Sequence, residues 1–332
     1  MLEKSKTIKL LRAAGKIYFY LYGYEERHKH ILSRGVDLLF YRDISFLEKV
    51  LLVYARLTKR HSKRIAQVRI KYSNAYNYSR KVLLKTIYDS FEFSKFITLP
   101  FSEDHPNPDG VIKWFFYSCN EIFYSNIYKL DKLLEDNDTI IDGGGNIGLF
   151  SLYAKNLREN ISCLVFEPEI NNFKALKKNL ENYKNIKFFN EGLSNTVSEA
   201  NLLISDNVLG HKLDSELIDF DLQANYYDSQ KIRLNTIDNV VFSTKIKKID
   251  LIKLDIEGSK LLALKGMVKT MEKYNPLLLV AVEHSNVQKP KIIKFFKENF
   301  KSYSYIELND QNVLFYNPKK HLSRINKLEK EK

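Results

Sequence analysis

Four glycines and one aspartate stand together in the stretch TIIDGGGNIGLF, residues 139–150, between two apolar runs. Glycine has no Cβ, so such a backbone can approach a ligand closely, and a helix that begins there offers free N–H groups to an anion. Gly143, Gly145 and Gly148 also have the G-x-G-x-x-G spacing of dinucleotide-binding turns. The stretch therefore predicts a site for NAD, FAD, a nucleotide phosphate or S-adenosylmethionine (SAM).

Two acidic residues favour SAM over NAD. Asp142 precedes the first glycine at the end of a strand, where its carboxylate would repel a pyrophosphate but can accept from the methionine ammonium group of SAM. Glu167 ends the next strand, 25 positions later, where it can hold ribose hydroxyls in either cofactor. An NAD-dependent dehydrogenase is therefore the weaker alternative, and a purely structural glycine turn is weaker still.

Three residues could remove a proton from an acceptor hydroxyl, since a carboxylate or histidine within hydrogen-bond reach can act as general base. Asp255 and Glu257 lie in KLDIEG after the fourth apolar run, and His284 follows the fifth. Strand alternation would place Lys253, Asp255 and Glu257 on one side, where three charges are costly unless a site uses them. A salt-bridged rim is the structural alternative, and a structural role is equally compatible with His284.

The elements that position these residues alternate between strand and helix. From residue 139 onwards, helical segments separate most of the short apolar runs TIIDGG, SCLVFEP, IKFFNEGL, IDLIKLD and PLLLVAVEH. This alternation predicts an α/β fold, with a doubly wound, Rossmann-like, mostly parallel sheet and helices on both faces. SYSYIEL and QNVLFYNP follow as a C-terminal antiparallel hairpin. Ligands bind at the carboxyl ends of strands in such sheets, where the candidate residues stand.

Four segments make up the predicted domain organisation. Residues 1–98 form a smaller, basic helical region, with apolar residues at three- and four-residue spacing and no proline. Residues 99–110 contain three prolines and a terminal Asp-Gly, which are typical of a linker. Residues 111–318 form the SAM-binding domain, and residues 319–332 a polar tail that we expect to fray.

Two stretches inside the main domain carry further expectations. After the linker, the segment up to residue 138 is interpreted as strand or turn material that leads into a short helix. The long polar insertion at residues 205–230 predicts a lid or acceptor loop, because long loops in α/β enzymes tend to be functional. It contains His211, the weakest of the candidate bases.

The positive charge of the chain is concentrated at its N-terminal end. Residues 1–95 hold 21 Lys and Arg against 8 Asp and Glu, whereas the remainder holds 32 of each. This asymmetry predicts a peripheral contact with an anionic membrane, a nucleic acid or an acidic partner. A solvated basic helical face is an equally good interpretation.

Several classes of protein are disfavoured by composition. No apolar run approaches the roughly 18 residues of a membrane-spanning helix, and no small-residue cleavage site follows the N-terminal apolar run. Cys119 and Cys163 are the two cysteines, so neither a disulfide framework nor a zinc site is expected. Acidic residues near the site specify no divalent cation. We therefore expect a cytoplasmic protein, with peripheral membrane attachment as a variant of that expectation.

Five motifs in order resemble the FkbM-type SAM-dependent methyltransferases, over about residues 121–283. They are IIDGGGNIGLFSLYA, VFEPEINNFKALKKNL, FFNEGLSN, RLNTIDNV and IDLIKLDIEGSKLLALKGM. The residues that the resemblance assigns to the methionine end of SAM are Asp142, Gly144, Asn146 and Gly148. Those that it assigns to the adenosine end are Glu167 at the ribose, and Glu191 and Ser194 near the adenine. It also implies that Asp255 and Glu257 close the site.

The sequence departs from the family pattern at a few positions. Lys260 stands where the family has an acid after Gly258-Ser259, and Gly143 and Gly145 replace other small residues. None of these changes removes an expected SAM contact. Lys260 bears on the acceptor side of the site.

The resemblance implies a SAM-dependent O-methyltransferase that acts on a hydroxyl, with a sugar of a glycan or glycolipid as the expected acceptor. Two alternatives stay open. Lys253, Asp255 and Glu283 could imitate the Lys-Asp-Lys-Glu tetrad of an RNA 2′-O-methyltransferase, and the basic region suits a phosphate backbone, although no RNA-binding module is recognisable. The other alternative is a non-catalytic docking subunit with a SAM-binding fold, in which Lys260 marks lost activity.

Overall fold

The computed structural model describes residues 2–18, 88–89, 93–100, 106–205, 211–214, 226–256, 258–282 and 288–329. Most of the predicted basic helical region lies outside these ranges. So do Glu257, Glu283 and His284, three residues of the expected site.

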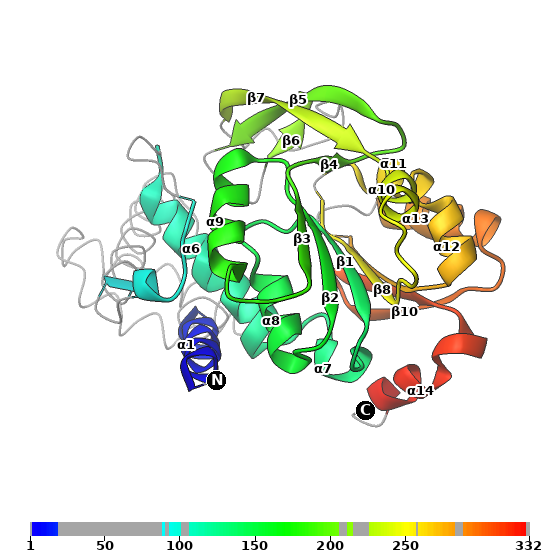
Figure 1. Cartoon of the computed structure of the whole chain (residues 1–332), viewed down its shortest axis with the longest axis horizontal. Coiled ribbons are helices and arrows are strands. Elements are labelled where there is room, and N and C mark those ends of the chain that lie inside the picture. Colours follow the sequence, from blue (N-terminus) through cyan, green and yellow to red (C-terminus); the bar gives the residue numbers. More distant parts are fainter. Residues whose placement is uncertain are drawn as a thin grey trace, which may run out of the picture.

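The main sheet of the described part has seven strands, in the order β10-β11-β9-β8-β1-β2-β3 (Figure 1). Its strands are β1 (Thr139–Gly143), β2 (Ser162–Phe166), β3 (Ile186–Phe189), β8 (Leu251–Leu254), β9 (Leu277–Ala281), β10 (Ser304–Asn309) and β11 (Asn312–Tyr316). The run from β3 to β9 is parallel, and β11 joins β9 and β10 antiparallel. The mostly parallel sheet and the C-terminal hairpin are therefore confirmed.

Helices cover both faces of this sheet (Figure 1). One face carries α8 (Leu149–Leu157) and α9 (Ile170–Leu180), and the other carries α10 (Ile237–Ser243), α11 (Lys260–Lys265), α12 (Val268–Tyr274) and α13 (Gln288–Asn299). Successive side chains of a strand point to opposite faces, so Ile140 of β1 joins one apolar cluster and Ile141 joins the other. The two faces together bury β1 and β9 at every position, as strands in a doubly covered sheet require.

A second, smaller sheet lies beyond the carboxyl end of the main sheet, at the top of Figure 1. It has the order β4-β7-β5-β6, with β4 (Gly192–Leu193), β5 (Ser198–Ser205), β6 (Lys212–Leu213) and β7 (Tyr226–Asn235). One side is apolar and includes Leu202, Ile232 and Leu234. The insertion that the sequence assigns to a lid or acceptor loop therefore contributes to β5, β6 and β7 in most of its described residues.

The segment before β1 begins with helix, so the expectation of strand or turn material there is wrong, whereas the short helix expected after it is present as α7 (Leu130–Leu133). The segment also contains α6 (Pro108–Cys119) and the π-helix η3 (Asn120–Tyr124). Asn107 accepts a hydrogen bond from the Gly110 N–H, and Pro108 occupies the first turn, so the predicted linker ends in a helix start. The α1 helix (Leu2–Tyr18) packs so closely on α6 and η3 that a Cβ on Gly15 would lie 2.4 Å from the Cys119 carbonyl oxygen.

The predicted polar tail forms a docked helix, α14 (Pro318–Glu329). Arg324 donates to both carboxylate oxygens of Asp138, at 2.7 and 2.9 Å, and to the Leu133 carbonyl at 2.9 Å. The Lys327 ammonium donates to Glu135 at 3.0 Å. These partners of Arg324 and Lys327 lie immediately before β1, far away in sequence, so the local polarity of the tail did not indicate them.

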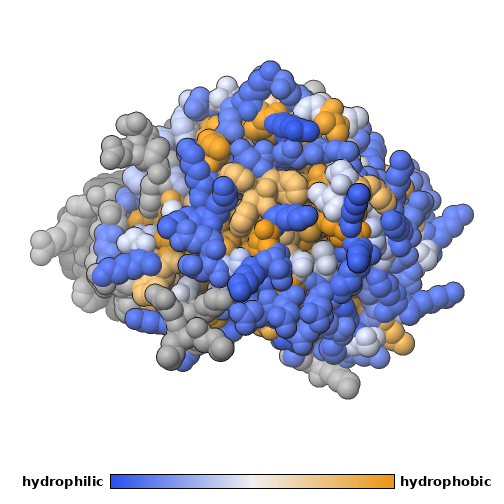
Figure 2. Space-filling model, in the orientation of Figure 1, coloured by the Kyte–Doolittle hydropathy of each residue, from blue (hydrophilic) through white to orange (hydrophobic). Residues whose placement is uncertain are grey.

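The surface shown in Figure 2 is largely hydrophilic, with hydrophobic residues gathered near its centre, below the second sheet. In the described part of the chain, no helix combines the length and the apolar character that crossing a bilayer demands.

Candidate active site

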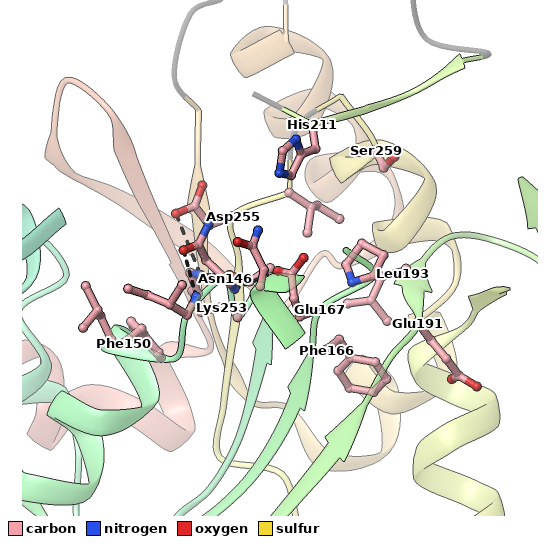
Figure 3. A pocket seen from close by; sticks show the side chains of 18 of the residues that line it. Asn146, Phe150, Phe166, Glu167, Glu191, Leu193, His211, Lys253, Asp255 and Ser259 are labelled. Carbon is pink, nitrogen blue, oxygen red and sulfur yellow. Dashed lines mark hydrogen bonds and ion pairs between the residues drawn. The ribbon is translucent and has the colours of Figure 1, made fainter. Parts of the chain in front are cut away.

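A cavity of about 1200 Å³, its open mouth included, lies between the carboxyl end of the main sheet and the second sheet (Figure 3). The glycine turn, the ends of β2 and β8, the second sheet and the α6–α7 segment all contribute to its wall. Polar groups at the strand ends and apolar side chains both face this space, which is typical of a small-molecule site.

The glycine turn has a different structural basis from the one that the sequence predicts. The N–H groups of Gly144 and Gly145 donate to the Phe166 carbonyl, at 3.1 and 2.8 Å, so they bind the end of β2 rather than a ligand. Gly144 has a φ of +79°, and a Cβ there would lie 2.0 Å from the carbonyl oxygen of Asp255. Close approach to the backbone after β8 therefore requires glycine at this position.

The four residues assigned to the methionine end separate into two groups. Gly144 and Asn146 line the cavity, whereas Asp142 and Gly148 do not. Gly148 instead adopts a φ of +89° as the residue that caps α8. The Asn146 N–H donates to Glu167 at 2.8 Å, which joins the turn to the end of β2.

Asp142 belongs to a buried charge network beneath the cavity. Its side chain is 0% exposed; one carboxylate oxygen accepts from Ser151 at 2.7 Å and the other from the Lys253 ammonium at 3.1 Å. Lys253 also donates to the Gly144 carbonyl at 2.8 Å. Burial alone would lower the pKa of Lys253, but Asp142 and Asp255 outweigh it and raise that pKa, so the ammonium stays charged. Asp142 therefore anchors Lys253 and the turn, without a surface in the cavity.

Asp255 stands just past β8 and faces the cavity, beside Lys253 (Figure 3). Its Oδ2 accepts a hydrogen bond from the Tyr128 hydroxyl at 2.9 Å and lies 3.8 Å from the Lys253 ammonium. Burial alone would raise the pKa of Asp255, but the charges of Lys253 and Lys260 and the Tyr128 hydrogen bond outweigh it and lower the pKa. Asp255 is therefore an anion at neutral pH.

Glu167 is a buried carboxylate in the cavity wall. It accepts from the N–H groups of Asn146 and Glu169, at 2.8 and 2.9 Å. Burial raises the pKa of Glu167 to about 7, and these two hydrogen bonds limit the rise. Glu167 therefore changes its protonation state near neutral pH, and carboxylates with such shifted pKa values are common at ligand-binding and catalytic sites.

Asn172 was not anticipated from the sequence. It lies in the first turn of α9, lines the cavity and is 1% exposed, and no described residue donates a hydrogen bond to its side-chain oxygen. A buried polar atom without a partner is uncommon and costly. Its place in the cavity wall points to a ligand donor.

Glu191 and Ser194, the residues predicted near the adenine, are engaged elsewhere. Glu191 lines the cavity, but its carboxylate accepts from Asn235 at 2.7 Å and pairs with Arg233 at 3.4 Å. Figure 3 shows this carboxylate directed away from Glu167. Ser194 is buried and does not line the cavity. The adenine side of the wall is instead apolar, with Phe166 and Leu193.

His211 is brought into the site by the second sheet. Its ring lies above Asn146 and Glu167 in Figure 3. The Ser205 N–H donates to its Nδ1 at 3.1 Å. Nδ1 is therefore an acceptor, and the proton of the neutral ring is on Nε2. This tautomer is a poor general base at Nε2.

The other predicted bases, Glu257 and His284, lie outside the described residues. In the ranges that the structure describes, no group of three or more His, Cys, Asp or Glu could hold a metal ion. Lys260 begins α11 and is 2% exposed. Its effect on the pKa of Asp255 shows that its charge acts on the site.

Comparison with known proteins gives a consistent family match. Residues 142–306 match the profile of the methyltransferase FkbM domain. The methyltransferase sdnD of Sordaria araneosa is 28% identical over 176 residues, which cover 44% of this chain and 66% of the relative. The AMB antimetabolite synthetase AmbE of Pseudomonas aeruginosa is 26% identical over 193 residues, 46% of this chain but 9% of the synthetase. The chain thus spans less than two thirds of these relatives.

Among solved structures, the methyltransferase FkbM of Methylobacillus flagellatus aligns with a TM-score of 0.42 and 15% identity. That alignment covers 74% of this chain and 60% of the other.

Proposed function

Residues 142–306 form a methyltransferase FkbM domain, and from this premise we propose that the protein transfers a methyl group from SAM to a hydroxyl of an acceptor. The proposed acceptor is a sugar of a glycan or glycolipid. The observation that carries the proposal is one cavity with a carboxylate at each side, Glu167 after β2 and Asp255 after β8.

The cavity wall fits the polar groups of SAM. The Glu167 carboxylate can accept hydrogen bonds, and so can the Asn172 oxygen, to which no described residue donates. Ribose hydroxyls and an adenine amino group are donors that would suit these two acceptors. Phe166 and Leu193 provide an apolar surface beside them for the base. Gly144 and Asn146 complete the donor side, while Asp142 supports it from below through Lys253.

SAM supplies a methyl group on a positively charged sulfur, with a neutral leaving group. The protein must then align the acceptor and take up the proton of its hydroxyl. Asp255 is our candidate for that proton, because it is anionic and faces the cavity. Glu257 and His284 remain candidates for the same step.

The acceptor side of the cavity suits a polyol. Tyr117, Ser118 and Glu121 of the α6–η3 segment line it and carry groups that exchange hydrogen bonds with hydroxyls. The sugar assignment itself is supported by the family resemblance.

Two site residues disfavour the alternatives. In an RNA-type tetrad the lysine must reach the substrate. Lys253 lines the cavity, but it is 3% exposed and its ammonium donates to Asp142 and to the Gly144 carbonyl, which disfavours that role. Lys260 lowers the pKa of Asp255 and so supports the charged form of that residue. This effect favours a working site over the non-catalytic alternative.

We also propose a cytoplasmic location, and a peripheral contact of the basic N-terminal residues 1–95 with an anionic membrane or an acidic partner. Their charge excess would steer the catalytic domain towards glycolipid or anionic glycan acceptors.

The function is tested by incubating the full chain with methyl-labelled SAM and three acceptor sets: methyl glycosides, extracted glycolipids and total RNA. We expect label in a carbohydrate fraction. Label in RNA would contradict the sugar proposal. Binding of S-adenosylhomocysteine (SAH) without any transfer would indicate a docking subunit, and tight NADH binding would overturn the donor assignment.

A further prediction concerns the pH dependence of donor binding. Ribose hydroxyls favour the charged carboxylate, so the pKa of Glu167 should fall from about 7 when the donor binds. Binding then releases a proton below pH 7, and the Kd of SAH should rise by up to about tenfold for each pH unit lost. Calorimetry at pH 6, 7 and 8 measures this change.

The control for that measurement is Glu167→Gln, which keeps the shape but removes the titrating proton. We expect weaker binding with a nearly constant Kd between pH 6 and 8. Equal wild-type affinities at pH 6 and pH 8 would show that Glu167 does not hold the donor as a carboxylate.

A further inference from the structure

We propose that Tyr128 is a positioning residue for methyl transfer: its hydroxyl fixes one oxygen of Asp255, so that the other oxygen faces the acceptor hydroxyl. This inference rests on the proposed function. It adds a residue that the sequence motifs do not contain, since Tyr128 lies 127 positions before Asp255.

The contacts of the two Asp255 oxygens are unequal. Oδ2 accepts from the Tyr128 hydroxyl at 2.9 Å and lies 3.8 Å from the Lys253 ammonium. No described residue donates a hydrogen bond to Oδ1. The side chain is 28% exposed and, like Tyr128, lines the cavity. One oxygen is therefore held by the protein, and the other is available to a substrate hydroxyl.

Tyr128 is itself fixed in place before any ligand binds. Its side chain is buried, and its ring packs edge-on against Phe150 of α8 at a centroid distance of 5.3 Å. The preceding carbonyl, that of Ile127, accepts from the Asn309 amide at 3.0 Å, which ties the segment to β10. Little conformational entropy is lost when such a phenol orients a carboxylate.

The reaction consistent with this geometry is balanced by a single proton transfer. The bond from the acceptor oxygen to the methyl carbon forms while the carbon–sulfur bond breaks, and the hydroxyl proton moves to Oδ1 of Asp255. The donor leaves as a neutral sulfide. The Tyr128 hydrogen bond stabilises the charged carboxylate beforehand, which keeps Asp255 ready to accept at neutral pH.

The experiment measures the pKa of Asp255 in the full chain saturated with SAH. Aspartate labelled with ¹³C at its carboxyl carbon reports the titration by NMR, and Asp255→Asn assigns the signal. The Tyr128 hydroxyl donates to the charged carboxylate, so Tyr128→Phe should raise the pKa of Asp255 by roughly one to two units.

The matched control is Tyr183→Phe. The Tyr183 hydroxyl accepts from Asn156 at 2.9 Å and does not line the cavity. This variant loses the same atom from a partly buried phenol and should leave the pKa of Asp255 unchanged.

Kinetics provide a second readout once a labelled acceptor is found. In Tyr128→Phe we expect kcat to fall about tenfold and the acid limb of kcat/KM to move to higher pH, with SAH affinity unchanged. An Asp255 pKa that is the same in wild type and Tyr128→Phe would overturn the positioning role. The other outcome is that Tyr128→Phe shifts the pKa of Asp255 but the wild-type protein transfers label to no acceptor. That outcome would overturn the proposed function, and with it the reaction that Tyr128 serves.

Discussion

Asp255→Asn is expected to reduce kcat by about a thousandfold while the Kd of SAH changes no more than a few fold. The asparagine side chain has the size of Asp255 and can still accept the Tyr128 hydrogen bond, but it cannot take up a proton. General base catalysis contributes roughly 10²–10⁴ in rate, which sets the scale of the loss. Transfer of labelled methyl and calorimetry with SAH measure the two quantities separately.

The control for this variant is Asp136→Asn, a change on an exposed residue at the opposite end of β1. It should leave both kcat and the Kd of SAH unaltered. A loss of tenfold or less in Asp255→Asn, with SAH binding intact, would show that another residue takes the proton. Glu257 and His284 would then be the next to test.

Lys253→Met is expected to lower the free energy of unfolding by about 3–5 kcal/mol, because it leaves the buried Asp142 carboxylate without its cation. The Ser151 hydroxyl remains as a hydrogen-bond donor to Asp142, but it carries no charge. Urea denaturation, followed by the fluorescence of Trp114, the single tryptophan, gives the free energy.

Two further variants make this result specific. Adding Asp142→Asn to Lys253→Met should recover part of the lost stability, because the double variant buries no unpaired charge. Lys231→Met breaks an exposed ion pair with Glu199 on the second sheet and should cost less than about 1 kcal/mol. A Lys253→Met protein as stable as Lys231→Met would show that the buried pair is not needed for the fold.

The sequence predicted which acids gather at the carboxyl end of the sheet, but not where each one points. Glu167 and Asp255 face the cavity because strand ends meet there. Asp142 was expected to join them, yet the parallel register sets it opposite Lys253 on β8. Side chains of register partners lie on the same side of a sheet, so the carboxylate turns to the lysine. Strand register is a long-range property that a local motif does not contain.

Residues that depend on distant packing were missed for a similar reason. Tyr128 follows the π-helix and reaches Asp255 only after the α6–α7 segment has docked. Asn172 looks like an ordinary polar residue of an amphipathic helix, and only its burial without a partner singles it out. The β7 strand has one exposed side and a polar sequence, which favoured a loop interpretation.

The docking of α14 also has a consequence for the order in which the chain becomes stable. Arg324 and Asp138 are separated by 186 positions. Ribosomes add about 5–20 residues per second, so the clamp on β1 arrives roughly 10–40 s after the aspartate it binds has been translated. During that interval the segment before β1 lacks its contacts with α14. A chain truncated before residue 318 would lack these contacts permanently.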